Sequence, residues 1–246
     1  MSEEIRKTYR VVEKVAEAPS VFTLKLVIDD CLMKDFIPSY RSGQFINVYF
    51  PEFGTPEGKS YSISSAPSEK TLNITVKVIG QFSNRLCALG KGDMITASLP
   101  YGYFYSESDD TELVMIAGGI GIVPFRSMII DASVRTPNRK LRLFCSYRAA
   151  ADIIFKKELD ALSAAALCDF KVFYFVTREE SHDSTIIFGR ISVNDIIGNA
   201  KKDRKNIAGR EFFMCGSIEF VGSFWKNLRK QGVPEKMMCT ESFFSH

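Results

Sequence analysis

The chain has 246 residues, a formal net charge of +3 and 25% charged side chains. This length suits one large domain or two ordinary ones, and so small a net charge argues against a nucleic-acid partner. The first residues are acidic and lack the apolar core of a secretion signal, and no run is long enough to span a membrane. We therefore expect a cytoplasmic protein.

The six cysteines contain no CxxC pair, and the chain adds only two histidines. Zinc and iron–sulfur sites usually need closely spaced Cys and His ligands, so we expect no metal site. Several cysteines lie in apolar runs, as in residues 141–146 and 212–216. Such runs are typical of reduced, buried thiols in a cytosolic protein.

Short β-rich runs fill the first hundred residues. They cover residues 9–28, 43–50, 71–80 and 93–104, and turns rich in glycine and proline separate them. One short helix is expected over residues 83–89, with Ser83 as its N-cap. Many short strands with such turns are typical of an antiparallel barrel or sandwich.

From about Thr111, apolar strands alternate with helices. Strands are expected over residues 112–119, 141–147, 170–177 and 212–216, and helices over residues 124–135, 152–166 and 217–232. This alternation predicts a parallel sheet covered by helices. We therefore expect two domains, residues 1–108 and 109–246, with the polar, acidic residues 106–112 as the linker.

Residues 58–67 break the pattern of a half-buried strand. Ser60 and Ser62 share one face, and Lys59 and Tyr61 share the other, so neither face resembles ordinary apolar core. Hydroxyls opposite a cation and an aromatic ring indicate a strand that contacts a ligand.

Three further segments join a glycine to the start of a helix. In residues 117–125 a buried strand runs into Gly119 and Gly121, and Pro124 stands in the first helical turn. Residues 79–86 and 214–221 repeat the arrangement more weakly. Glycine permits close backbone approach, and a helix N-terminus favours phosphate, although a tight turn alone would also explain each segment.

Six motifs in order resemble the ferredoxin–NADP reductase superfamily, and they cover nearly the whole chain. They are KSYS, GQFSNRL, GGIGIVPF, SYR, MCGSIEF and ESF, the first at residues 59–62 and the last at 241–243. The resemblance implies an antiparallel Greek-key flavin-binding barrel followed by a Rossmann-like parallel α/β NAD(P)-binding domain. It also implies an oxidoreductase that passes electrons between NAD(P)H and a small one-electron carrier protein, such as ferredoxin or flavodoxin, by hydride transfer to flavin N5.

For the flavin, the resemblance places Lys59 at the phosphates, Tyr61 against the isoalloxazine ring and Ser62 near N5. Lys59 replaces the family's Arg, which keeps the charge and loses the bidentate fork. Gly80 and Ser83 match the Gly-x-x-Ser segment of the family, which favours FAD over FMN. The remaining expected FAD contacts are Ser60, Val76, Lys77 and Phe82.

For the nicotinamide nucleotide, Gly119, Gly121 and Pro124 resemble the pyrophosphate loop. Cys215 and Gly216 match the Cys-Gly pair near the nicotinamide, and Glu241 and Phe243 match the C-terminal Glu-x-Tyr. Either Phe243 or Phe244, or neither ring, would stack on the flavin. The expected catalytic residues are Ser62, Cys215 and Glu241.

The sequence favours NADP(H) as the nicotinamide nucleotide, and NAD(H) is kept as the alternative. Thr177 and Arg178 resemble the Ser-Arg pair of NADP-using members, and Tyr147 and Arg148 follow the preceding strand. Two other functions fit the same residues: an electron-transfer subunit that is active only within a larger complex, and a reductase of free flavin.

Overall fold

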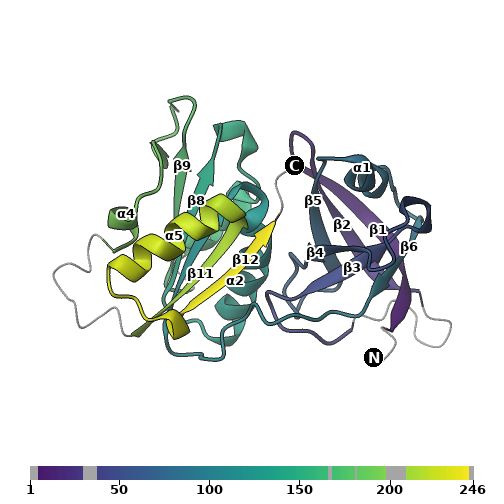
Figure 1. Cartoon of the computed structure of the whole chain (residues 1–246), viewed down its shortest axis with the longest axis horizontal. Helices are drawn as coiled ribbons and strands as arrows, with labels where there is room; N and C mark the ends of the chain where they lie inside the picture. The colour runs from purple at the N-terminus through teal and green to yellow at the C-terminus, as the bar shows by residue number, and fades with distance from the viewer. Residues whose placement is uncertain (1–4, 30–37, 166–167, 181, 198–208, 244–246) are drawn as a thin grey trace. The chain divides into compact units, whose positions relative to one another are not determined.

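The computed structural model describes residues 5–29, 38–165, 168–180, 182–197 and 209–243. The chain divides into two compact units, close to the predicted boundary after residue 108 (Figure 1). The first unit is Met1–Tyr105 together with Arg126–Asp131, and the second is Ser106–Phe125 together with Ala132–His246. One stretch of a later helix therefore groups with the first unit.

The first unit is an antiparallel barrel with the strand order β4-β3-β6-β1-β2-β5. Its strands are β1 (Arg6–Ala18), β2 (Val21–Ile28), β3 (Phe45–Tyr49), β4 (Lys59–Ser62), β5 (Leu72–Lys77) and β6 (Met94–Ser98). The two end strands meet through a bridge between Ile63 and Ile74, and the Ser64 N–H donates to the Asn73 carbonyl at 2.8 Å. The sheet thus closes on itself, which confirms the predicted barrel.

Alternate side chains of these strands fill the barrel. Leu24 and Leu26 of β2, and Leu72 and Ile74 of β5, are fully buried in one apolar cluster. The short helix α1 (Gln81–Cys87) adds Phe82 to the same cluster. This helix is therefore held by apolar contact with the barrel, because seven residues alone would not form a stable helix.

Helix α1 begins two residues earlier than predicted, so the expectation that Ser83 is its N-cap is wrong. Gly80 occupies the cap position with an extended backbone (φ −146°), and Ser83 is the third helical residue. Its hydroxyl accepts hydrogen bonds from the N–H groups of Ile79 and Gly80, at 2.9 and 3.0 Å. Ser83 still closes the helix start, but from inside the first turn.

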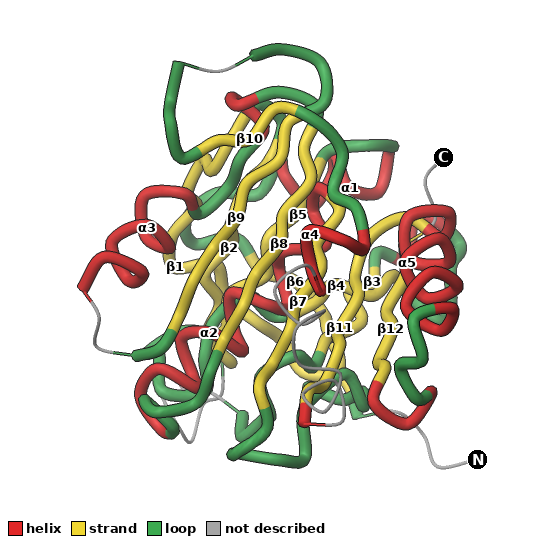
Figure 2. The backbone as a smooth tube through the Cα atoms, turned by 90° about the vertical axis from the view of Figure 1, so that its left-hand side faces the viewer, coloured by secondary structure: helices red, strands yellow, loops and turns green. Residues whose placement is uncertain are grey.

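The second unit is a parallel sheet with the strand order β10-β9-β8-β7-β11-β12. Its strands are β7 (Glu112–Gly118), β8 (Leu141–Tyr147), β9 (Phe170–Val176), β10 (Ile186–Phe188), β11 (Arg210–Ser217) and β12 (Met238–Phe243). Its helices are α2 (Val123–Arg135), α3 (Lys156–Ala165), α4 (Val193–Ile197) and α5 (Ile218–Lys230). Figure 2 shows α5 on one side of the strands of this sheet and α3 on the other. The predicted Rossmann-like fold is confirmed.

The helix predicted over residues 152–166 begins only at Lys156. A 3₁₀ turn ends at Asp152, Ile153 is extended, and Phe155 has a positive φ of 59°. Ile153 and Ile154 are buried, so these apolar side chains fill the core from an irregular segment. The apolar residues at the start of 152–166 suggest a longer helix, but the structure buries Ile153 and Ile154 in a turn before the helix begins.

Candidate functional site

Strand β4 presents the two unlike faces that its sequence predicts. Ser62 pairs with Phe45 of β3, and Ser60 pairs with Asn47. The Ser60 hydroxyl donates to Asn47 Oδ1 at 2.7 Å, and Ser62 is 6% exposed. The hydroxyl face is therefore organised by side chains of the neighbouring strand.

Lys59 and Tyr61, on the other face, both lie near Phe82 of α1. The Tyr61 and Phe82 rings are 6.3 Å apart between centroids and 23° from parallel, and Lys59 Nζ is 5.5 Å from the Phe82 centroid. Burial raises the pKa of the Tyr61 phenol well above its ordinary value, so the ring stays neutral. Lys59 is exposed and has no carboxylate partner within the described ranges, which leaves its charge available to a phosphate.

The start of α1 lies next in the chain to β5 and its exposed last residue, Lys77. Val76 is buried in the barrel core. Gly80 is exposed, and a Cβ added to it would meet no atom within 4 Å. The first N–H groups of a helix have no partner inside the helix, so this open start could receive an oxyanion. Ser83 supports the turn and is 9% exposed.

Four strands of the second unit end at one edge of the sheet because they run parallel. Gly118 ends β7, Tyr147 ends β8, Val176 ends β9 and Ser217 ends β11. In an open α/β sheet, ligands bind outside these carboxyl ends.

Two of the expected glycines hold the turn after β7 against β11. Gly119 has a left-handed backbone with φ +54° and opens the 3₁₀ turn Gly119–Ile122. A Cβ on Gly121 would lie 2.2 Å from the Cys215 carbonyl oxygen. Pro124 is buried at the second position of α2. Gly121 thus serves backbone packing in this structure.

Cys215 and Glu241 are register partners on β11 and β12. Cys215 is fully buried, and its burial, with a smaller contribution from the nearby Glu241, raises the pKa of the thiol well above its ordinary value. The thiol is therefore neutral near pH 7, which fits a packing or hydrogen-bonding role better than nucleophilic attack. Ser62, the third expected catalytic residue, belongs to the first unit.

Phe243 is half-buried at the end of β12 and pairs with Ser217. The residues ESF therefore continue the parallel sheet and do not fray. Phe244, the alternative ring, lies outside the described residues. A Cβ on Gly216 would lie 3.0 Å from the Phe220 ring, so Gly216 makes room for an aromatic side chain of α5.

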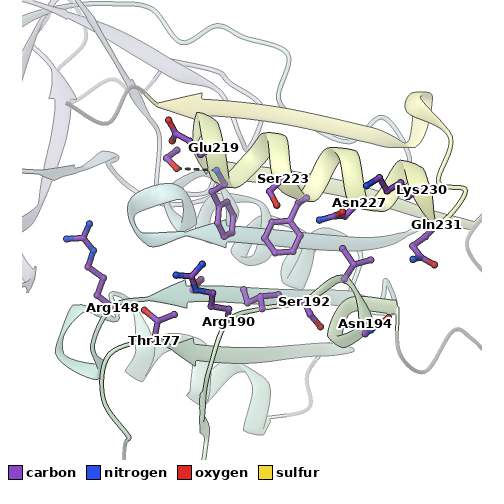
Figure 3. A pocket seen from close by; sticks show the side chains of 16 residues that line it. Arg148, Thr177, Arg190, Ser192, Asn194, Glu219, Ser223, Asn227, Lys230 and Gln231 are labelled. Carbon is purple, nitrogen blue, oxygen red and sulfur yellow. Dashed lines mark hydrogen bonds between the residues drawn. The ribbon is translucent and has the colours of Figure 1, made fainter.

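A cleft of about 850 Å³ lies between α5 and the ends of β8 and β9 (Figure 3). Arg148 and Thr177, both expected from the sequence, line it, and Arg190 lines it as well. Arg178 is exposed and does not line it, nor does the buried Tyr147. Successive side chains of a strand point to opposite faces. Since Ser146 and Arg148 face the cleft, the Tyr147 side chain between them faces away from it.

The sequence analysis missed Arg190 because it follows β10, a strand of only three residues. The signal that could have indicated it is the apolar run of residues 186–188 followed by a glycine and a cation. Gly189 has a φ of +132°, which allows the chain to turn there.

The cleft is suited to an anion. Arg148, Arg190 and Lys230 line it together with a single carboxylate, that of Glu219. None of these three cations has an ion-pair partner in the part of the chain that the structure describes. Glu179, which follows Arg178 in the sequence, does not line the cleft and accepts a hydrogen bond from the Ala150 N–H at 3.1 Å. The cations can therefore bind phosphate without displacing a carboxylate.

Two classes of site are not found among the described residues. No helix there combines the length and apolar character needed to cross a bilayer. Nor does that part of the chain bring three His, Cys, Asp or Glu side chains together as a metal site.

The comparisons with known proteins agree with this geometry. Residues 115–225 match the family described as the oxidoreductase NAD-binding domain. A flavohemoprotein of Bordetella pertussis is 27% identical over 96% of this chain and 60% of its own length. One component of the Na(+)-translocating NADH-quinone reductase of Neisseria meningitidis is 27% identical over 79% of this chain and 51% of its own length.

Among solved structures, a ferredoxin NADP+ reductase from Neisseria gonorrhoeae with bound FAD and NADP superposes with a TM-score of 0.78. It is 22% identical and covers 98% of this chain and all of its own length. Residues 115–225 thus match an oxidoreductase NAD-binding domain, and the superposition confirms the fold that the resemblance to ferredoxin–NADP reductases implies. The chain spans about 60% of the length of the flavohemoprotein relative and 51% of that of the quinone reductase component.

Proposed function

We propose that this chain is an FAD-containing reductase that takes a hydride from NADPH and passes single electrons to a small carrier protein. The observation that carries the proposal is the cleft at the carboxyl edge of the parallel sheet, lined by cations without ion-pair partners in the described residues. It lies within the segment that matches the oxidoreductase NAD-binding domain, residues 115–225, apart from its lining residues beyond Phe224.

The residues of the first unit fit FAD. Lys59 offers an exposed ammonium group, the half-buried Tyr61 offers its ring, which the buried Phe82 supports from the core, and Gly80 leaves the start of α1 open. When bound, a flavin can accept a hydride and release electrons one at a time. Lys59 and the turn at Gly80 would hold the phosphates, and the Ser62 hydroxyl would serve the reactive edge of the ring.

The residues of the second unit fit a phosphorylated dinucleotide. Arg148 and Arg190 stand on the strand side of the cleft beside Thr177 (Figure 3). Guanidinium groups bind phosphate through paired N–H donors, so this wall is the proposed site of the NADPH 2′-phosphate. Cys215 and Glu241 do not line this cleft, and their place near the nicotinamide stays a prediction from the resemblance.

Two alanine substitutions test whether Arg190 or Arg178 binds the 2′-phosphate. We expect Arg190→Ala to raise the KM for NADPH about tenfold or more, because one charged hydrogen-bonding group contributes about 1.5–3 kcal/mol, and to leave the KM for NADH nearly unchanged. Arg178→Ala is the matched control, since it removes the same charge from a side chain that does not line the cleft. Steady-state kinetics with an artificial one-electron acceptor measures both.

Equal effects of Arg190→Ala on both nucleotides would remove the case for a 2′-phosphate site. A larger effect of Arg178→Ala would return the assignment to the Thr-Arg pair that the sequence suggests.

A second function is favoured by the lengths of the relatives. The chain matches only 51% of the NADH-quinone reductase component and 60% of the flavohemoprotein. We therefore keep a reductase module that delivers electrons within a larger assembly as the alternative. It would reduce artificial acceptors like the main candidate, but would turn over no free carrier protein.

A further inference from the structure

A partly buried ion pair, in which the Glu69 side chain is 28% exposed, holds the loop that directly follows the Ser62 strand. Arg126 lies in the stretch of α2 that groups with the first unit, and its side chain is 11% exposed. Arg126 Nη1 is 3.0 Å from Glu69 Oε2, and Nη2 is 3.3 Å from Glu69 Oε1. Nη1 also donates to the Ser64 carbonyl at 2.7 Å. One guanidinium therefore joins a carboxylate to the backbone two residues after Ser62.

The next residues of the same loop are held as firmly. The Ser127 hydroxyl donates to the Ser65 carbonyl at 2.5 Å, and the Tyr40 hydroxyl lies 2.8 Å from Ser65 Oγ. Ser65 Oγ in turn accepts from the Asn73 N–H at 2.9 Å. Two consecutive carbonyls, those of residues 64 and 65, thus receive side-chain donors from α2. We call Arg126, Ser127 and Glu69 the loop clamp.

The clamp goes beyond what barrel closure requires. The bridge between Ile63 and Ile74 and the bond from the Ser64 N–H already join β4 to β5. Desolvating the Arg126 guanidinium is costly, so this partly buried pair contributes little net stability and is better suited to fixing one geometry. The same helix carries an ordinary surface pair, Arg135 with Asp109, whose side chains are 55% and 57% exposed.

We propose that Arg126 is a positioning residue for hydride transfer, because the loop clamp fixes the backbone that carries the Ser62 hydroxyl. The inference rests on the proposed function. Ser64 is only two residues from Ser62, and β4 is only four residues long, so few backbone dihedrals lie between the clamped carbonyl and the Ser62 hydroxyl. Misplacement of a reacting group by about 1 Å can slow a reaction by about 10²-fold.

The experiment uses the full chain loaded with FAD. In single-turnover reduction by NADPH, we expect Arg126→Ala to slow flavin reduction at least tenfold at saturating nucleotide, with the Kd for the nucleotide unchanged. Arg126→Lys keeps the positive charge but loses the paired N–H donors of the guanidinium. Its rate of flavin reduction should lie between the rates of Arg126→Ala and the wild type. Arg135→Ala, the matched control on the same helix, should reduce flavin at the wild-type rate. Millimolar methylguanidinium should restore part of the rate in Arg126→Ala.

A second readout does not depend on activity. In the flavin-free protein, we expect amide hydrogen exchange over residues 62–69 to accelerate at least tenfold in Arg126→Ala and not in Arg135→Ala. If Arg126→Ala does not fold, Glu69→Gln replaces it, since it keeps the side-chain shape and removes the charge that pairs with Arg126.

Two results would overturn the proposal. One is a folded, flavin-loaded Arg126→Ala with the wild-type reduction rate, and the other is unchanged exchange over residues 62–69. A wild-type chain that binds no flavin would instead refute the proposed function, and the exchange experiment would still decide whether the clamp holds this loop.

Discussion

Glycine serves two different purposes at the turn after β7. Gly119 has a left-handed backbone, with φ +54°, and open space where a Cβ would stand. Gly121 is needed for space, since a Cβ there would lie 2.2 Å from the Cys215 carbonyl oxygen. The sequence pattern alone predicts that both are phosphate-loop glycines. Only the structure shows that Gly119 is needed for its backbone conformation and Gly121 for the space beside β11.

This distinction predicts opposite effects of two alanine substitutions. Gly121→Ala should lower the free energy of unfolding by about 1–3 kcal/mol, because the added methyl group meets backbone that cannot move aside. Gly222→Ala should raise it by about 0.5–1 kcal/mol, because Gly222 lies within α5 and has no atom within 4 Å of its Cβ position. Chemical denaturation of both variants measures the difference. A Gly121→Ala protein as stable as the wild type would show that the turn can shift away from β11.

At the scale of elements, α1 shows how one hydroxyl can hold a ligand-facing turn. The Ser83 hydroxyl accepts from two N–H groups before the helix and donates to the Gly80 carbonyl at 2.9 Å. The element is only seven residues long, so its start depends on these bonds and on the Phe82 contact.

Ser83→Ala should therefore destabilise the flavin-free protein by about 0.5–2 kcal/mol, the usual effect of losing a helix cap. It should also weaken FAD binding, because the freed turn no longer presents its N–H groups in one direction. Thermal unfolding and flavin fluorescence titration measure the two effects. Asn84→Ala is the control, since exposed Asn84 donates to the same Gly80 carbonyl at 3.1 Å and should change both quantities less. Equal effects of the two substitutions would contradict a special role for Ser83.

In the second unit, the strands that the sequence predicted are those buried over most of their length. The central strands β7, β8 and β11 are buried over nearly their whole length, so apolar runs indicate them directly. Strands β10 and β12 were missed because they are edge strands with mixed exposure, and α4 was missed because it has five residues. The predicted helix over 152–166 was too long because apolar content does not distinguish a buried turn from a helix.

Some residues of the candidate site could be predicted from local sequence, and others could not. The KSYS strand and the glycine turn were recognisable from their own residues, and their contacts to a cofactor stay predictions. Arg190 and the loop clamp were not recognisable, because each depends on chain segments that are distant in sequence: Arg126 and Glu69 are 57 residues apart. Local patterns cannot state which distant side chains meet.

At the scale of the whole molecule, the three candidate functions differ in how long the flavin stays bound. A reductase of free flavin releases it at every turnover, whereas an electron-transfer reductase or module retains it. The cation of Lys59 lacks the paired donors of arginine, which weakens one phosphate contact. The barrel offers further contacts at Tyr61 and the start of α1, so we expect retention.

The corresponding prediction concerns the purified chain. FAD should remain bound in about a one-to-one ratio after desalting, and NADPH-dependent reduction of a one-electron acceptor should continue with no flavin added. Absorbance spectra and acceptor kinetics before and after desalting measure both, and Lys59→Arg should slow flavin loss because it restores the fork. Activity that disappears on desalting and returns hyperbolically with added FAD would identify a free-flavin reductase. Retained flavin with turnover of artificial acceptors, but of no carrier protein, would favour the module of a larger assembly, since such a module meets its natural acceptor only within that assembly.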